Sequence, residues 1–232
     1  MAVRFAAGKI KVLAGTGGNS TAEAIYLTQE AEKAGADGSL QVAPYYNKPT
    51  QQGLFQHFYT IATRCQLPIM LYSIPSRCGV EIAADTVNHL LHDCPNIIGI
   101  KEAGGTPDRV SQLRALLGSK FIILCGDDSL TLPFMSVGAQ GVVSVASNVI
   151  PKEVSQMVQA YKMGKCDLAL KIHNKFYPLF KDLFIETNPG PVKAALHMLN
   201  QIEEEYRLPL VRMSPKNRKA LRASLKVCGL LD

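Results

Sequence analysis

Short apolar runs alternate with longer amphipathic segments over roughly the first two thirds of the chain. The runs contain little polar alternation, as in strands that are buried on both faces. Their starts lie roughly 20 to 30 residues apart, and parallel strands need crossover connections of about this length. The pattern predicts repeated βα units that form a parallel sheet covered by helices. The predicted strands are residues 11–16, 38–44, 68–74, 97–103, 121–127 and 141–147.

Beyond the sixth run the apolar positions follow helical spacing. Gly164 and the turn at residues 187–190 separate some of these segments. We therefore expect residues 1–150 to form the βα portion and residues 151–232 a helical region. The predicted helices are residues 151–163, 167–184, 191–199 and 215–227.

Six strands are compatible with two architectures. An open doubly wound sheet accommodates six, whereas a (β/α)8 barrel has eight strands and about 250 residues. Periodicity alone does not distinguish them. Both architectures place ligands at the carboxyl ends of the strands.

The run at residues 97–103 ends in a lysine where a buried strand should offer aliphatic side chains. With a period of two, Ile97, Gly99, Lys101 and Ala103 share one face, which would then bury a cation. Desolvation lowers a lysine pKa towards the range in which the amine is a nucleophile. The alternative is a lysine at the strand end that extends to water.

Composition narrows the class of protein. With 232 residues, 47% of them hydrophobic, the chain can form a sizeable core, and no apolar run reaches the roughly 18 residues of a membrane helix. We expect a cytoplasmic protein that binds neither membrane nor nucleic acid. The net charge of +6 could suit nucleic acid or an anionic small substrate. However, Lys219, Arg222 and Lys226 recur at helical spacing, which favours a solvated helix face.

Polar side chains cluster at the predicted strand ends. A lysine amine, phenols that relay protons and an arginine that grips a carboxylate are the groups that a Schiff-base enzyme for keto acids requires. This combination favours Lys101 as a nucleophile. The strand-end residues are Thr16, Asn19, Tyr45, Tyr46, Tyr72, Arg77, Lys101, Glu102, Asp127, Asp128, Ser144 and Ser147.

Other signals favour ordinary structural roles. The glycines of residues 15–18 do not follow a phosphate-loop pattern, so a tight βα turn is the better interpretation. The five histidines show no metal-ligand clustering. Asp127 and Asp128 could bind Mg²⁺, but a helix N-cap followed by a first-turn acid fits them better.

Six motifs together resemble the dihydrodipicolinate synthase family of pyruvate-dependent class I aldolases, in order and over essentially the whole chain. This resemblance implies a (β/α)8 barrel, here with about six strands, and a C-terminal helical appendage. The motifs are GTGGNST at residues 15–21, PYYNKP at 44–49, LYSIPSRCG at 71–79, IGIKEA at 98–103, GDD at 126–128 and FIETNP at 184–189.

The resemblance also implies roles for single residues. Lys101 would form an imine with pyruvate, and Tyr72 would donate and accept protons beside it. Tyr46 would relay protons within the site of a neighbouring subunit. Arg77 would hold the carboxylate of the aldehyde substrate, and the backbone of Val143 would line the pyruvate pocket. The implied substrate-binding positions are Arg77, Val143 and Gly126.

The implied reaction is attack of a pyruvate enamine on L-aspartate 4-semialdehyde, for lysine and diaminopimelate biosynthesis. The protonated imine is the electron sink, so the resemblance implies neither a metal nor an organic cofactor. A dimer of dimers is the implied assembly. Asn19, Glu23 and Tyr45 match part of the family's lysine-binding regulatory site.

The resemblance is incomplete at the front of the chain. A complete barrel would require about 60 further residues before residue 1, so we expect either a longer natural polypeptide or a folded chain with impaired catalysis. Two other interpretations stay open. One is another 2-keto acid aldolase, such as N-acetylneuraminate lyase, and the other is an inactive binding or assembly protein.

Overall fold

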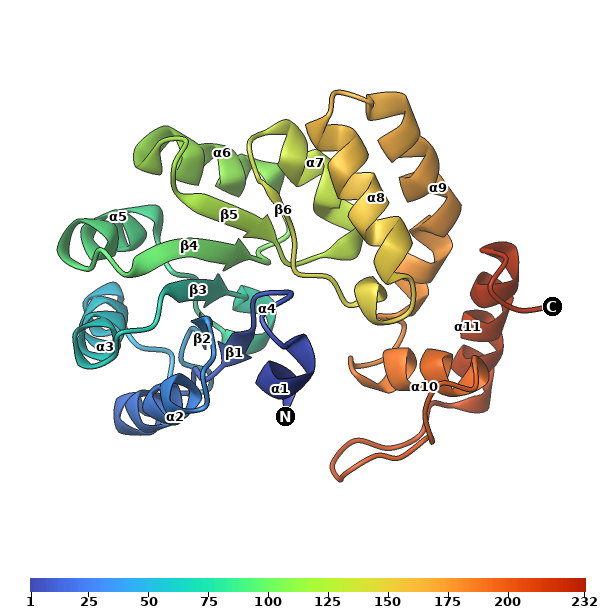
Figure 1. Cartoon of the computed structure of the whole chain (residues 1–232), viewed down its shortest axis with the longest axis horizontal. Coiled ribbons are helices and arrows are strands. Elements are labelled where there is room, and N and C mark those ends of the chain that lie inside the picture. Colours follow the sequence, from blue (N-terminus) through green and yellow to red (C-terminus); the bar gives the residue numbers. More distant parts are fainter. The chain divides into compact units, whose positions relative to one another are not determined.

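The computed structural model describes residues 1–232 and contains two compact units (Figure 1). The first consists of Met1–Cys125 with Ser136–Gln140, and the second of Gly126–Met135 with Gly141–Asp232. A parallel sheet organises the first unit, whereas the second is mainly helical.

The strands of the first unit each pair in parallel with the next one along the chain. Each lies within the run that the sequence predicted, so the prediction of parallel βα units is confirmed. The strands are β1 (Leu13–Gly15), β2 (Gly38–Val42), β3 (Ile69–Ser73), β4 (Ile97–Glu102) and β5 (Ile122–Cys125).

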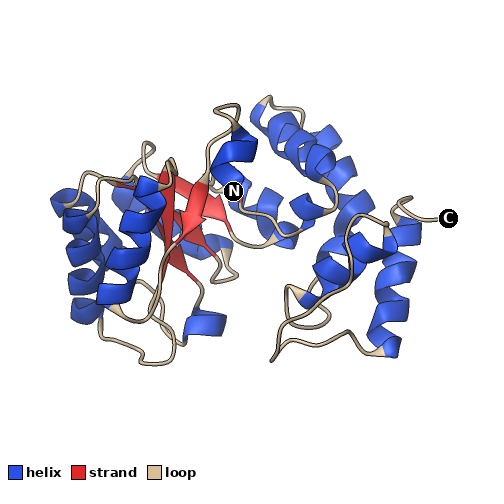
Figure 2. Cartoon of the chain, turned by 60° about the horizontal axis from the view of Figure 1, so that its bottom comes forward, coloured by secondary structure: helices blue, strands red, loops and turns tan.

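Helices cover one face of this sheet, and successive helices pack side by side (Figure 2). Ser20, Thr50 and Thr106 each stand immediately before a helix, and each hydroxyl accepts a hydrogen bond from a first-turn backbone N–H. These caps fix where the long helices begin. The covering helices are α2 (Thr21–Lys33), α3 (Gln51–Arg64), α5 (Ala84–Asp93) and α6 (Pro107–Leu117), and the unit also contains the short helices α1 (Ala2–Ala6) and α4 (Pro75–Cys78).

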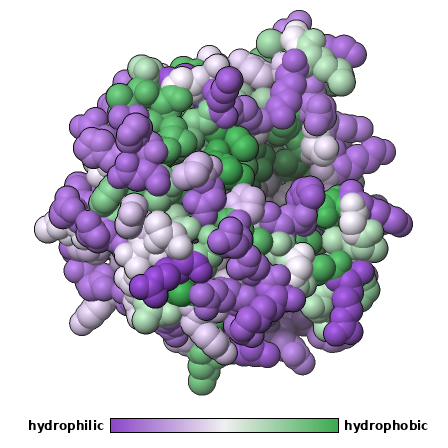
Figure 3. Space-filling view, turned by 60° about the vertical axis from the view of Figure 1, so that its left-hand side comes forward, coloured by the Kyte–Doolittle hydropathy of each residue, from purple (hydrophilic) through white to green (hydrophobic).

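The outward surface of these helices is mostly hydrophilic, with apolar side chains gathered in places (Figure 3). On the face of the sheet beneath them, Leu71, Ile100 and Ile123 have no exposed surface. Burying each of these side chains contributes about 1.5–3 kcal/mol. Residue 99 must be glycine, because a Cβ there would lie 2.5 Å from the carbonyl oxygen of Ile122 on β5.

A β-bulge in β4 corrects the predicted alternation. Ile69 pairs with Ile97 and Met70 pairs with Gly99, so Ile98 is an extra residue that is 37% exposed. The extra residue moves Ile97 to the helix-covered face. The expectation that Ile97 shares a face with Lys101 is therefore wrong, although Gly99 and Lys101 do share one.

The second unit begins with two short helices, one short strand and another short helix, and four longer helices follow. The sequence predicted all four longer helices to within two residues, and α11 exactly as observed. The elements are η1 (Asp128–Leu130), α7 (Thr131–Ser136), β6 (Gly141–Val142), η2 (Ala146–Asn148), α8 (Pro151–Lys162), α9 (Cys166–Asp182), α10 (Gly190–Met198) and α11 (Pro215–Val227).

The core of the second unit is apolar, and Leu179, Ala194 and Leu221 have no exposed surface.

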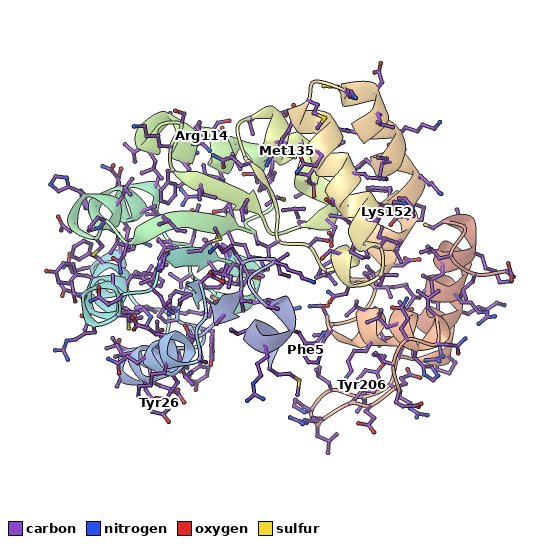
Figure 4. All side chains as sticks on the ribbon, in the orientation of Figure 1. Phe5, Tyr26, Arg114, Met135, Lys152 and Tyr206 are labelled. Carbon is purple, nitrogen blue, oxygen red and sulfur yellow. The ribbon has the colours of Figure 1, made fainter.

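A polar cluster fixes the loop before α11. Glu204 accepts hydrogen bonds from Tyr206 (3.0 Å) and from Arg218 on α11 (2.6 Å). Figure 4 shows Tyr206 in this loop beside α10. Burial and the Glu204 carboxylate raise the pKa of Tyr206 to about 12, so its hydroxyl stays protonated.

A buried histidine in the first unit makes the stability of the folded chain depend on pH. His57 on α3 is 6% exposed, its Nδ1 lies 2.8 Å from Thr21 Oγ1 and its Nε2 has no hydrogen-bond partner. Burial lowers the pKa of His57 from 6.5 to about 4. Between these values the unfolded chain binds more protons at this site than the folded chain, so stability falls as the pH drops.

We expect this histidine to account for roughly 3 kcal/mol of the stability lost between pH 7 and pH 4. Urea denaturation at several pH values would measure the loss. The variant His57→Gln cannot be protonated, so its stability should fall less over the same range. Equal pH dependence in the two proteins would contradict the assignment to His57.

Candidate active site

Strands β3 and β4 bring a phenol and an amine together. Tyr72 and Lys101 are direct partners in the parallel register, so their side chains point from the same face of the sheet. The Nζ atom of Lys101 lies 4.0 Å from the centroid of the Tyr72 ring. A cation over an aromatic face is attracted by the ring quadrupole. The predicted pair is therefore in contact, with Lys101 half-buried rather than extended into bulk water.

Tyr72 keeps its proton at neutral pH. Burial raises the pKa of its hydroxyl, and the charge of Arg77 opposes this shift only in part. A protonated phenol beside an amine can give a proton to a reacting group and take it back.

A cavity of about 440 Å³ lies beside Tyr72 and Arg77 in the first unit. Leu40 and Val42 on β2 supply apolar surface to it, while Tyr72 and the exposed Arg77 supply polar groups. This volume suits a small organic molecule. The other lining residues are Gly15, Gly17, Tyr45, Ile74 and Cys78.

The glycine-rich segment after β1 is a tight turn into α2, as the sequence predicted. Gly17 hydrogen-bonds through its N–H to the carbonyl oxygen of Leu40, and a Cβ at residue 17 would lie 2.3 Å from the nitrogen of Val42. Only glycine allows the turn to approach β2 this closely. The turn thereby forms part of the cavity wall.

The tyrosine pair lies on an exposed loop after β2. Tyr46 is 90% exposed and has a positive φ of 74°, so its ring projects into solvent. Asn19 donates a hydrogen bond to the carbonyl oxygen of Tyr45 (3.3 Å), which brings these two residues together. Glu23 is exposed in the first turn of α2, where its N–H bonds to Ser20 Oγ (3.4 Å).

Two predicted substrate-binding positions, Gly126 and Val143, belong to the second unit. Asp127 caps η1, as predicted, by accepting a hydrogen bond from the N–H of Ser129 (2.8 Å). Asp128 has a role that the sequence did not indicate. It is 2% exposed, and its Oδ2 accepts hydrogen bonds from the N–H groups of Val145 and Ala146, 3.0 Å each. Asp128 thus fixes the turn that follows Val143.

A buried ion pair that was not predicted from the sequence lies on the helix-covered face behind Lys101. Glu102 follows Lys101 but points to the helix-covered face, where it has no exposed surface. Its Oε2 lies 3.6 Å from Nε of Arg109 on α6. Burial raises the pKa of Glu102, while the Gly104 N–H and Arg109 oppose this shift. A strand-end acid four residues before the helix N-cap Thr106 would have been a usable signal.

A family model described as "Dihydrodipicolinate synthetase family" matches residues 1–228. This chain belongs to that family. Members catalyse Schiff-base condensation as lyases of the class I aldolase type, in lysine and diaminopimelate biosynthesis. The resemblance noted in the sequence is therefore confirmed.

Curated relatives in the dihydrodipicolinate synthetase family match nearly the whole chain. A 4-hydroxy-tetrahydrodipicolinate synthase of Aquifex aeolicus is 54% identical and aligns with 99% of this chain and 78% of its own length. One of Persephonella marina is 52% identical and aligns with 100% and 79%. Each relative is thus longer than the matched part.

A solved structure of the family agrees in fold. The 4-hydroxy-tetrahydrodipicolinate synthase of Methylacidiphilum fumariolicum SolV is 57% identical and superposes with a TM-score of 0.97. The superposition covers 98% of this chain and 76% of that one.

None of the helices of our protein is both long and apolar enough to cross a membrane.

Proposed function

We propose that this chain condenses pyruvate with L-aspartate 4-semialdehyde to give 4-hydroxy-tetrahydrodipicolinate. The observation that carries the proposal is the contact between Lys101 Nζ and the ring of Tyr72, a residue that lines a cavity of suitable size. Relatives that are 54% and 52% identical and named for this reaction support it.

In the proposed reaction, Lys101 attacks the keto carbon of pyruvate and water leaves, which forms an imine. Loss of a proton from the methyl carbon gives an enamine, with the protonated imine nitrogen as electron sink. The enamine carbon then bonds to the aldehyde carbon of the second substrate, whose oxygen takes up a proton. Finally the amine of that substrate attacks the imine carbon, closes the ring and releases Lys101.

Tyr72 moves the protons of these steps, because its hydroxyl is protonated and its ring contacts the amine. Arg77 binds the carboxylate of the aldehyde substrate, since it is a cation at the cavity wall. The family resemblance assigns pyruvate-binding roles to the backbones of Val143 and Gly126. The fold that this implies is a (β/α)8 barrel, with residues 1–150 as its barrel portion and 151–232 as the helical region.

The exposure of Tyr46 supports an assembly in which several copies of the chain associate. Tyr46 projects away from its own unit, so it acts by entering the site of a second copy in a cytoplasmic dimer of dimers. Asn19, Glu23 and Tyr45 form part of a lysine-binding regulatory site in the same region. The hydrogen bond that joins Asn19 to Tyr45 supports this grouping.

Turnover measurements separate the synthase from its alternatives. We expect the protein to consume pyruvate and L-aspartate 4-semialdehyde in equal amounts and to leave N-acetylneuraminate intact. Arg77 and the tyrosine pair favour this outcome over a lyase of the same class. Faster cleavage of N-acetylneuraminate would reassign the substrate, and absence of turnover with either would favour a binding protein.

A further inference from the structure

Arg109 on α6 contacts two separate segments of the first unit, the end of β4 and residues 81–82. Its Nε lies 3.6 Å from Glu102 Oε2 at the end of β4 and 3.8 Å from Glu81 Oε1. Its Nη2 donates a hydrogen bond to the carbonyl oxygen of Ile82. The side chains of Arg109 and Glu102 are 7% and 0% exposed, so their contact is out of water, whereas the Glu81 side chain is 46% exposed.

A gain in folding stability alone does not explain the buried ion pair between Glu102 and Arg109. Glu102 Oε2 and Arg109 Nε are buried without a hydrogen-bond partner, so the ionic contact only partly compensates the loss of hydration. An apolar pair of similar size is often as stable as a buried ion pair. A buried pair of this kind can instead impose one specific geometry, which is a hypothesis to be tested in each protein.

The segments that Arg109 joins carry the candidate site. Glu102 directly follows Lys101, and its Oε1 accepts a hydrogen bond from the Gly104 N–H (2.6 Å). Ile82 follows α4, the short helix that carries Arg77. The N–H of Ile82 also donates to Ser73 Oγ (3.4 Å), next to Tyr72 in the chain. The Arg109 guanidinium therefore contacts the residue that follows Lys101. It also bonds to Ile82, which is hydrogen-bonded to the neighbour of Tyr72 and follows the helix that carries Arg77.

We propose that Arg109 is a positioning residue that holds Lys101 in register with Tyr72 and Arg77 by anchoring Glu102 and the carbonyl of Ile82. This inference rests on the proposed function of Lys101. Arg109 itself lies on the opposite face of the sheet from Lys101, so it acts through the backbone rather than on substrate. A displacement of about 1 Å in a catalytic group can lower a rate 100-fold.

The test compares Arg109→Lys with a matched control on the same helix. Arg114 also donates to backbone carbonyls, those of Phe121 (3.0 Å), Gly138 (2.7 Å) and Gly118, none of which adjoins a candidate catalytic residue. It lies on α6 in Figure 4. For Arg109→Lys we expect kcat and the rate of borohydride-trapped imine formation with pyruvate to fall 10- to 100-fold. Arg114→Met should lower stability to urea but leave both rates unchanged.

A double variant separates positioning from stability. Glu102→Leu combined with Arg109→Met replaces the ion pair by apolar side chains, which should restore stability towards the unsubstituted level. We expect kcat to stay low in this variant while the urea midpoint recovers. Recovery of kcat together with stability would overturn the proposal, as would an unchanged kcat in folded Arg109→Lys. If the unsubstituted protein forms no pyruvate adduct, the proposed function itself fails, a different result from either of these.

Discussion

Replacing Lys101 by alanine is expected to abolish the covalent adduct that borohydride traps with pyruvate. In the unsubstituted protein, reduction of the imine should add the mass of the reduced pyruvyl group irreversibly to the peptide that contains Lys101. Without the amine no imine forms, and turnover should fall by a factor on the order of 10³ or more. Intact-mass spectrometry and peptide mapping measure the adduct, and consumption of both substrates measures turnover.

The matched control is Lys48→Ala. Lys48 is an exposed lysine of the same unit, and its side chain lies near Gly79 at the end of α4. If reaction with pyruvate merely reflected an accessible amine, this substitution would reduce the adduct. We expect the adduct and the turnover of Lys48→Ala to equal those of the unsubstituted protein. An adduct on folded Lys101→Ala, or on another lysine, would remove Lys101 from the mechanism.

The sequence was sufficient to predict most elements of the fold. Apolar runs at βα spacing placed β1 to β5, and the helices of the second unit followed from amphipathic spacing bounded by glycine and proline. Element boundaries near Gly164 and Pro215 were reliable because these residues restrict the backbone locally. Such signals act within a few residues, which is why a single sequence reveals them.

Features that depend on register could not be predicted in the same way. The bulge at Ile98 arises from how β4 pairs with β3, and nothing in the string Ile97-Ile98-Gly99-Ile100 marks the extra residue. Alternation therefore assigned Ile97 to the wrong face. The burial of Glu102 was missed for a related reason, since its partner Arg109 lies on a helix whose polar residues suggest a solvated surface.

The candidate site was predictable in part. The rule that ligands bind at strand ends selected Lys101, Tyr72 and Arg77 from the sequence, and the register of β3 with β4 then accounts for the contact between the first two. Their individual roles came from the family resemblance. The hydrogen bonds of Asp128 to Val145 and Ala146 were not predicted, because they join residues 17 and 18 positions apart and local patterns carry no information at that separation.

Replacing Tyr72 by phenylalanine is expected to lower kcat by 10²- to 10⁴-fold, the range typical of a lost general acid–base group. The KM for pyruvate should change little. Phenylalanine keeps the ring over which the Lys101 ammonium lies at 4.0 Å, so the position of the amine is preserved and imine formation remains possible. Only the hydroxyl is lost, and burial keeps that hydroxyl protonated in the unsubstituted protein by raising its pKa.

Steady-state kinetics together with borohydride trapping distinguish a proton-transfer role from a packing role. Tyr72→Phe should still reach a full adduct at saturating pyruvate, although more slowly, because the nucleophile and the ring are both present. Tyr72→Leu serves as the control, since it also removes the aromatic face and should weaken the positioning of Lys101. If the hydroxyl transfers protons, the two variants lose similar kcat but only the leucine variant loses pyruvate affinity. Unchanged kcat in Tyr72→Phe would show that the phenol only packs against the lysine, and the proton donor would have to be sought elsewhere.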